Sequence, residues 1–440
     1  MPAYRVGLLA VLAAQAYAQS AAPATGIQQG SQDETRSSVG QTDSSPSLTV
    51  GQLVNELMEN NPALRAARFR FEAATKRPSQ VGTLPEPKVS YTNFGVGHPF
   101  SHLNGSNFAY QGFGVSQSIP YPGKLALASE QARREAQSEE QMYRAAVLDA
   151  IARLKVAYYD WFYLGKAVEI TEKDRDLMER FERIARARYT VGKGIQPDVL
   201  RAQVELSTLA QQLETFEQRR ASVEAQINSL LDRPIDAPIG KPVEVKQSPL
   251  RFQLSDLLGP LGESSPDLRA RQYQTESASV GIERAKKDFR PDFGVNFQWQ
   301  HTGSRFPDYY MATAEVTVPV FFWRKQRYGL EEAEARLQES RQNYRATREQ
   351  LLFNAKDQYL IAKSTERILA LYESGIIPQA SLSLEATISA YEVGTVDFLT
   401  LINNFQNLLK YEMQYYEELA KHEQALARLE PIVGQTLTQQ

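Results

Sequence analysis

Residues 125–190 read LALASEQARREAQSEEQMYRAAVLDAIARLKVAYYDWFYLGKAVEITEKDRDLMERFERIARARYT, with no proline and with Gly165 as the one glycine. Positions in this stretch recur in alternating steps of four and three residues, which is the spacing of a coiled-coil seam. They are Val147, Ile151, Leu154, Tyr158, Trp161, Gly165 and Val168. The stretch therefore predicts a single helix, roughly 100 Å long at 1.5 Å per residue. A rod of that length buries its seam only against parallel neighbours.

The rest of the chain repeats one unit twice, at a distance of about 200 positions. The matching segments are NPALRA at 61–66 with SPDLRA at 265–270, Ile119-Pro120 with Val318-Pro319, and YTVG at 189–192 with YEVG at 391–394. We therefore expect a first structural repeat at 48–250 and a second at 251–432, followed by a C-terminal tail at 433–440.

Each copy is predicted to contain the same parts in the same order. A first helix, at about 49–82 or 254–288, leads to a strand pair bounded by prolines, a long helix, a glycine turn and a returning helix. The seams of the returning helices are Leu206, Leu209, Leu213, Phe216, Arg220, Val223, Ile227 and Leu230, and Phe398, Leu401, Phe405, Leu408, Glu412, Tyr415, Leu419, His422, Leu426 and Leu429. Long and returning helices therefore predict an antiparallel coiled hairpin in each copy. The proline-rich residues 233–250 are expected to connect the copies outside the bundle.

The predicted strands have one apolar and one polar face. In the second copy the apolar positions are Phe293, Val295, Phe297 and Trp299, then Tyr310, Ala312, Ala314, Val316 and Val318. The pattern around 89–95 and 109–119 is the same but is weakened by glycines. No further helix is expected to cover this apolar face, and the strands have the length of tilted membrane strands. We therefore expect the face to contact lipid. Open edges are not tolerated in lipid, so a barrel of which each chain supplies four strands must be shared between subunits, in a number that the sequence leaves open.

The first residues predict export. Arg5 precedes an apolar run from Val6 to Ala14, and the segment AYA at 16–18 fits a small-x-small cleavage site, so residues 1–18 are expected to be a signal peptide. An uncleaved anchor is the alternative, but the run is shorter than the roughly 20 residues of a spanning helix. Residues 19–47 contain hardly a large apolar side chain and are expected to be a disordered segment.

Composition excludes several classes of function. The net charge of −3 gives no reason for a nucleic-acid partner, and the absence of cysteine excludes thiolate metal sites and disulfides. The chain has no phosphate-binding glycine loop, no nucleophile motif and no HExxH, so we expect no enzyme, no catalytic residue, no cofactor and no metal site. We interpret His98, His102 and His301 as loop residues and His422 as a packing residue, with metal contact by the first three as the alternative.

Three groups of short segments are distinctive enough to compare with known families. They are LPEP at 84–87, VSQSIPYPGK at 115–124, and the paired Tyr-x-Val-Gly turns. With the duplicated helices and strands, they resemble the TolC-like outer-membrane efflux channels over residues 48 to about 432. Gln117, Pro120 and PGK at 122–124, with GTVDFL at 394–399, are most similar to the heavy-metal cation branch, the outer-membrane members of cobalt-zinc-cadmium and copper-silver exporters.

The resemblance implies a mixed α/β membrane protein with an internal two-fold repeat. Three chains would share one 12-stranded β-barrel, four strands from each, on a periplasmic tunnel of long antiparallel α-helical coiled coils. Such a homotrimer in the Gram-negative outer membrane passively conducts substrate, here heavy-metal cations. A periplasmic adaptor (membrane fusion) protein joins it to an inner-membrane pump of the RND type. The alternatives are a channel for drugs or secreted polypeptide, and a soluble periplasmic coiled-coil scaffold or adaptor.

The resemblance also implies two sites at the glycine turns. The residues that match adaptor-contacting tips are Tyr189, Val191, Gly192, Tyr391, Val393, Gly394 and Thr395. The residues that match a periplasmic gate are Asp198, Tyr391, Asp397, Thr400 and Asn403. Val396, Thr400 and Asn403 replace charged residues of other members, so a less tightly held and less acidic gate is expected. The glycines can equally be plain helix caps, and Asp198 can simply favour the positive end of its helix.

An aromatic cluster follows the last predicted strand. Phe321, Phe322 and Trp323 are suited to an aromatic girdle at the periplasmic surface of the membrane. Packing of the joint between barrel and helices is the alternative. Pro120 and Pro319 are expected to mark that joint, because proline ends strand pairing.

Overall fold

The computed structural model describes residues 48–95, 109–259, 261–303, 306–434 and 436–438. The predicted signal peptide (1–18), the predicted disordered segment (19–47) and the residues His98 and His102 lie outside the described residues. All elements below belong to one unit that begins at Ser45.

The long helix predicted from the sequence is confirmed. Helix α3 runs from Lys124 to Thr190 without interruption, over 67 residues. The helix begins after Gly123 and ends before Gly192. Both glycines have positive φ, 93° and 71°, a conformation that costs glycine little. Leu154, Tyr158 and Trp161 of the predicted seam are buried.

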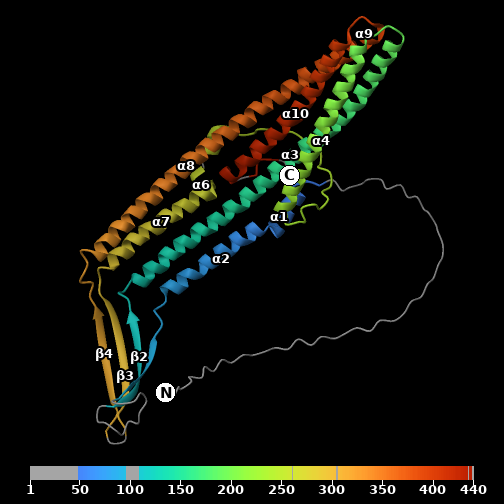
Figure 1. The fold of residues 1–440 in the computed structure, drawn as a ribbon. Helices are drawn as coiled ribbons and strands as arrows, with labels where there is room; N and C mark the ends of the chain where they lie inside the picture. Colours follow the sequence, from blue (N-terminus) through green and yellow to red (C-terminus); the bar gives the residue numbers. More distant parts are fainter. Residues whose placement is uncertain (1–47, 96–108, 260, 304–305, 435, 439–440) are drawn as a thin grey trace, which may run out of the picture. The chain divides into compact units, whose positions relative to one another are not determined.

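Helix α3 is the central helix of the unit (Figure 1). Towards the sheet it packs against α2 (Pro62–Gly82) and α7 (Pro266–Lys287), and towards the other end against α4 (Gln196–Leu230) and α10 (Phe398–Val433). Helix α8 (Lys325–Leu371) packs on α7 and α10, and α9 (Ile377–Val393) packs on α10. The two predicted antiparallel hairpins are therefore present. None of the described helices is long and apolar enough to cross a membrane.

The prediction of a single first helix in each copy is wrong. In the first copy Asn61 separates α1 (Val50–Asn60) from α2, and it caps α2 because its side-chain oxygen accepts the Leu64 N–H at 3.0 Å. Pro62 then occupies the first helical position, where its missing N–H costs nothing. In the second copy the chain forms three helices: α5 (Leu254–Leu258), α6 (Leu261–Ser264) and α7.

The long helix of the second copy also differs from α3. A π-helical turn, η2 (Tyr372–Ile376), separates α8 from α9. Pro378 lies at the start of α9 and has no N–H to continue a regular ladder, which explains the break at this point. The same region is one uninterrupted run of α-helix in the first copy.

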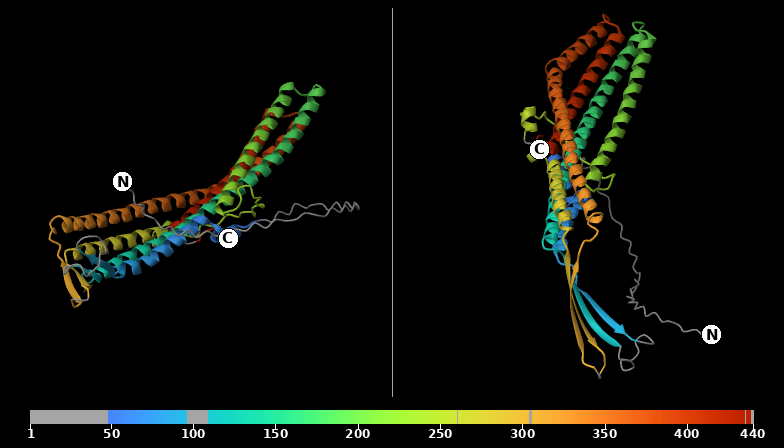
Figure 2. Two further views of the ribbon diagram at one scale, coloured as in Figure 1. Left: turned by 60° about the horizontal axis from the view of Figure 1, so that its bottom comes forward. Right: turned by 90° about the vertical axis from the view of Figure 1, so that its left-hand side faces the viewer.

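The four strands form one antiparallel sheet in the order β1-β2-β3-β4 (Figure 2). Their bounds are Lys88–Phe94 for β1, Tyr110–Ile119 for β2, Asp292–His301 for β3 and Tyr309–Thr317 for β4. Strands β2 and β3 pair, so the sheet joins the two copies of the repeat. As predicted, each long helix is preceded by a strand that ends at a proline. Strand β2 ends directly before Pro120, and β4 ends two residues before Pro319.

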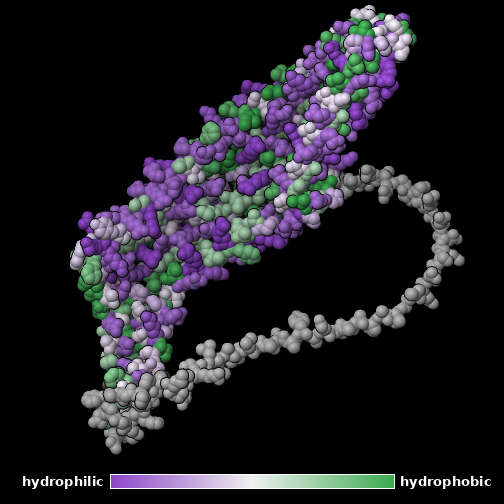
Figure 3. All heavy atoms as spheres, in the orientation of Figure 1, coloured by the Kyte–Doolittle hydropathy of each residue, from purple (hydrophilic) through white to green (hydrophobic). Residues whose placement is uncertain are grey.

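The pairing register aligns the predicted apolar positions on one face. Phe297 lies between Val115 of β2 and Ala312 of β4, and Val89 of β1 pairs with Val115. This apolar face is exposed in the single chain. Hydrophobic residues also gather at the helical tips and where the sheet joins the helices, on a mostly hydrophilic surface (Figure 3).

The connector and the C-terminal segment pack against the middle of α3. Leu48 donates its N–H to the Lys241 carbonyl at 3.0 Å, beside the Tyr158 hydroxyl, which donates to the Leu48 carbonyl at 3.0 Å. After α10, Thr438 is buried and binds the Glu430 carboxylate through its N–H at 2.9 Å. Lys155 of α3 donates to the same carboxylate at 2.6 Å. The C-terminal tail is therefore fixed by a buried ion pair at its described end.

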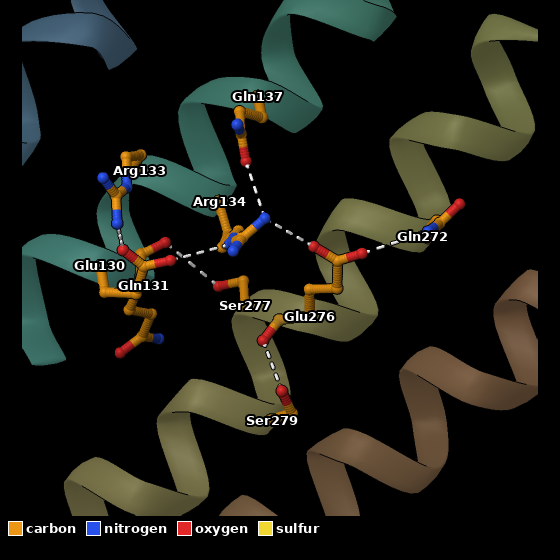
Figure 4. Close-up of polar contacts among 9 residues, drawn as sticks. All are labelled: Glu130, Gln131, Arg133, Arg134, Gln137, Gln272, Glu276, Ser277 and Ser279. Atoms are coloured by element: carbon orange, nitrogen blue, oxygen red, sulfur yellow. Dashed lines mark hydrogen bonds and ion pairs between the residues drawn. The ribbon is translucent and has the colours of Figure 1, made fainter.

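Helices α3 and α7 meet through a polar and small-residue interface (Figure 4). Arg134 of α3 donates to Glu130 on its own helix and to Glu276 of α7, both at 2.9 Å. Ser138 donates to the Ala270 carbonyl at 3.1 Å. This interface fixes the register between the helices that lead into and out of the sheet.

Candidate functional site

The two glycine turns lie at the same end of the helices, far from the sheet (Figure 1). Gly192 and Gly394 both have positive φ, 71° and 84°. The residue after each glycine donates its N–H five residues back, Lys193 to Arg188 at 2.9 Å and Thr395 to Ala390 at 3.0 Å. These are the bonds of a Schellman cap, so both tips are built by the same motif at equivalent positions of the repeat.

The tips expose apolar side chains. Val191 is 67% exposed and Val393 is 76% exposed, and Tyr189 beside them is also exposed. Gly192, Gly394 and Thr395 are exposed as well. Tyr391 differs from the other residues expected at the tips, because only 4% of it is exposed. Its ring packs against Phe398, at 5.5 Å between centroids.

Arg188 of α3 connects the two hairpins, a role that the sequence analysis missed. Its guanidinium donates to the Tyr391 carbonyl of α9 and lies over the Tyr391 ring, 4.8 Å from the centroid. A Cβ on Gly394 would come 3.0 Å from the same guanidinium, so glycine leaves the space that Arg188 fills. No local pattern marks this arginine, because its partners lie one repeat away in the sequence.

Asp198 lies in the same cluster. Burial raises the pKa of its carboxyl, nearby Asp397 raises it further, and Arg201 and Arg188 oppose the rise. Burial likewise raises the pKa of the Tyr391 hydroxyl, and Asp198 adds to that rise while Arg188 opposes it. The structure therefore brings together Asp198, Tyr391 and Asp397 of the expected gate, with Arg188 among them.

The other two expected gate residues, Thr400 and Asn403, lie near the start of α10. Asp397 caps this helix, because its side chain accepts the Thr400 N–H at 2.9 Å. The hydrogen bonds from Thr400 lower the pKa of the Asp397 carboxyl. Thr400 and Asn403 are exposed on the helix surface. Thr400 thus contacts the cluster through its backbone, and Asn403 lies one helical turn beyond it.

A rigid apolar core supports the tips. It joins α3, α4, α9 and α10, and Phe181 meets Phe405 in it edge to face at 5.9 Å between centroids. Ala202, Leu209 and Leu401 are buried in the same core. The exposed turns are therefore held on packed helices rather than on mobile loops.

The aromatic cluster near the sheet is exposed. Phe321, Phe322 and Trp323 are 65%, 52% and 53% exposed, and Trp323 contacts both phenylalanine rings. At the other end of the sheet His301 lies 2.6 Å from Asp308. His422 is buried, with its Nε2 2.8 Å from the Ser248 carbonyl. Within the described residues, no three histidine or carboxylate side chains are grouped to hold a metal ion.

The arrangement defines a class of protein: a channel subunit that places a few strands in a membrane and long helical hairpins outside it. Comparison with known families agrees, because the family described as outer membrane efflux protein matches residues 53–233 and 257–435. The chain belongs to this family, whose members are channels rather than enzymes. It is a protein of the Gram-negative outer membrane with its helical part in the periplasm.

The closely similar solved structures share the fold at low identity. VceC of Vibrio cholerae has a TM-score of 0.77 at 19% identity, over 88% of this chain and 96% of that chain. The open state of MtrE of Neisseria gonorrhoeae has a TM-score of 0.74 at 19% identity, over 88% and 89%. CusC has a TM-score of 0.75 at 15% identity, over 88% and 92%.

One relative by sequence is the fusaric acid resistance protein FusA of Burkholderia cepacia. It is 27% identical over 199 residues, and the alignment covers 41% of this chain and 34% of that protein. The chain thus matches about a third of the length of this relative.

Proposed function

We propose that three copies of this chain form the passive outer-membrane channel of a tripartite efflux system. The observation that carries the proposal is the pair of identically built turns, each of which exposes a valine, Val191 or Val393, on one packed apolar core. Exposed apolar side chains on a rigid support are typical of a docking surface. The partner is a periplasmic adaptor protein, and through it an inner-membrane pump of the RND type.

The sheet supports a shared barrel. Strands β1 and β4 are the edges of the four-stranded sheet, and edges left open in lipid leave backbone groups without hydrogen bonds. Three chains would pair these edges into a barrel of twelve strands. A soluble scaffold is disfavoured, because Val89 and Tyr310 on the apolar face of the edge strands stay exposed.

For the cargo we propose heavy-metal cations. The support is the similarity of residues 115–124 and 394–399 to the heavy-metal branch. A second candidate is a small organic acid such as fusaric acid, because FusA is a relative by sequence. Drugs and secreted polypeptide are further alternatives. All are compatible with a passive channel, whose cargo is selected by the pump.

The gate is proposed at the tip cluster of Asp198, Tyr391 and Asp397, with Thr400 and Asn403 beyond it. Asp198 and Tyr391 come from different hairpins, and Arg188 ties those hairpins together. Opening would separate hairpins that polar contacts of this kind hold together.

The function is tested in the source bacterium lacking this gene, complemented with variants. Val191→Glu/Val393→Glu should abolish resistance, because charges replace the apolar docking surface, while conductance of the purified protein in planar bilayers persists. The control is Ile235→Glu, which changes an equally exposed apolar residue in the connector. Growth is scored against Zn²⁺, Cd²⁺ and fusaric acid.

Each result has a distinct meaning. Loss of Zn²⁺ and Cd²⁺ tolerance in the deletion strain supports the cation cargo, and loss of fusaric acid tolerance alone supports the second candidate. Equal resistance in the tip variant and the control contradicts adaptor docking at the tips. A wild-type protein without conductance, extracted without detergent, contradicts the channel itself.

A further inference from the structure

Four basic residues surround the point where the sheet joins the helices. Lys287 and Arg290 lie at the end of α7, and Arg324 and Lys325 lie at the start of α8. We call these four residues the basic collar. Asp288, which follows Lys287, and Gly329, which follows Lys325 by four residues, line one cavity of about 620 Å³ between α3, α7 and α8.

The nearby carboxylates are already paired with other bases. Lys124 binds Asp292 at 2.9 Å and Asp288 at 3.6 Å. Glu331 binds Arg327 at 3.0 Å. Among the described residues, no carboxylate lies within ion-pair distance of a collar side chain. Asp288 and Asp292 share the one base Lys124, so these three residues and the collar together carry a net charge of +3.

The helix dipole favours a cation at only one of the two helix ends in the collar. Lys287 lies in the last turn of α7, where a cation is favoured. Arg324 and Lys325 lie at the start of α8, whose first turn contains no acidic residue and whose N-cap side chain accepts no hydrogen bond from the helix backbone. A cation at that positive end is disfavoured. The folded chain alone therefore gives no reason for these two cations.

The collar is continuous with the lipid-facing surface. Phe321, Phe322 and Trp323 directly precede Arg324 and are more than half exposed. The apolar face of the sheet continues to Phe293 and Val316, at the same end. Lys287 lies over the Tyr121 ring, with its Nζ 5.5 Å from the centroid. Aromatic side chains mark the membrane interface, and basic side chains extend from it to the headgroups.

From these observations we propose that the basic collar binds the phosphate groups of anionic phospholipids in the periplasmic leaflet. Phosphatidylglycerol and cardiolipin have the required chemistry, a phosphate charge above acyl chains that cover the aromatic cluster. Each basic residue near an anionic membrane surface adds to the attraction, and salt weakens it. The collar would thus fix the depth of the barrel in the membrane.

The test compares the trimer in nanodiscs of phosphatidylethanolamine with either phosphatidylglycerol or phosphatidylcholine, 3:1. Retained lipid is counted by native mass spectrometry. The variant is Arg290→Gln/Arg324→Gln/Lys325→Gln. The control, Arg341→Gln/Arg345→Gln/Lys356→Gln, removes the same charge from exposed positions further along α8. Arg341 lies about 24 Å from Lys325 at 1.5 Å per residue, beyond the Debye length.

We expect wild type and control to retain phosphatidylglycerol about tenfold over phosphatidylcholine, a preference that 0.5 M NaCl reduces. The collar variant should form the same trimer and lose the preference. An unchanged preference in the variant overturns the proposal. The proposal is also overturned if inorganic phosphate stabilises the detergent-solubilised protein as much as phosphatidylglycerol does, because that result would indicate a site for free anions. A changed ion selectivity of the channel with unchanged lipid preference would place the collar in the lumen and overturn it as well.

Discussion

At the scale of single residues, Arg188 makes a polar contact between the two hairpins at the tips. Its guanidinium both donates to the Tyr391 carbonyl and covers the Tyr391 ring, so it adds a polar contact between α3 and α9 to the apolar core that joins the hairpins. Charged hydrogen bonds and cation–π contacts of this kind each contribute about 1–2 kcal/mol. The tip is therefore sensitive to one substitution in a way that its exposed turns are not.

Arg188→Gln should loosen the hairpins and raise the mean single-channel conductance, by about twofold or more, because about 1–2 kcal/mol is enough to shift a closed tip toward open states. Planar bilayer recording measures this. Arg183→Gln is the matched control. Arg183 is exposed, and its ion pair with Glu179 is long, at 3.9 Å, and lies within α3. Equal conductance of the two variants would show that Arg188 does not restrain the tip.

Asp174 of α3 is a buried carboxyl whose charge should lower the stability of the protein. It is only 7% exposed, and its Oδ2 has no hydrogen-bond partner among the described residues. Burial raises the pKa of its carboxyl to about 7, and Glu412 on the seam of α10 adds to the rise, while Lys173 opposes it. The folded state thus binds a proton that the unfolded state releases near pH 4.

Because the folded pKa is raised, this carboxyl costs stability as the pH rises from about 4 to 7, and the full cost applies above pH 7. Asp174→Asn should therefore stabilise the protein, by about 1–3 kcal/mol more at pH 8 than at pH 5. Thermal unfolding of detergent-solubilised trimer at both pH values measures the difference. Asp176→Asn, at an exposed neighbouring position, should change stability little at either pH. A gain for Asp174→Asn that does not depend on pH would rule out this titration.

At the scale of elements, the buried pair of Lys155 and Glu430 fixes the C-terminal segment to α3. Glu430 accepts from Lys155, from the N–H groups of Leu437 and Thr438, and from the Thr438 hydroxyl. Breaking one side of a buried pair leaves an uncompensated charge.

Glu430→Ala should destabilise the protein by about 3–5 kcal/mol, since it leaves Lys155 buried and alone. Lys155→Met/Glu430→Leu should recover most of the loss, because both charges are removed together. Thermal unfolding of the two variants gives the comparison. If the double variant is as unstable as Glu430→Ala, the tail contacts rather than the charge carry the effect.

The elements also show how far the sequence alone predicts this fold. The seam of α3 and the alternation in β3 and β4 follow from local periods of 3.5 and 2, and the glycine turns follow from the repeated Tyr-x-Val-Gly segments. All are present. The break at Asn61 carried a local signal, an Asn cap before Pro62, which the longer apolar pattern hid. Arg188 and the tail bound by Glu430 carry no such signal, because their contacts form only after distant segments pack.

At the scale of the whole molecule, the two faces of the sheet meet different surroundings. Ala312 of β4 lies on the apolar face opposite Phe297, and Thr313 lies on the polar face opposite Asn296. In a shared barrel the first face meets lipid and the second faces the water-filled lumen. The pair of neighbouring positions therefore distinguishes a membrane barrel from a soluble sheet.

Ala312→Arg should cost about 2–4 kcal/mol, because a charge enters the lipid-facing band, and should lower the yield of heat-resistant trimer in the outer membrane. Thr313→Arg, one residue away, should leave the trimer intact and shift the ion selectivity of the channel toward anions, because its charge enters the lumen. Semi-native gel electrophoresis of membrane fractions and reversal potentials in planar bilayers measure the two effects. Interchanged phenotypes would mean that the apolar face lines the lumen, and equal tolerance of both substitutions would mean that the sheet does not meet lipid.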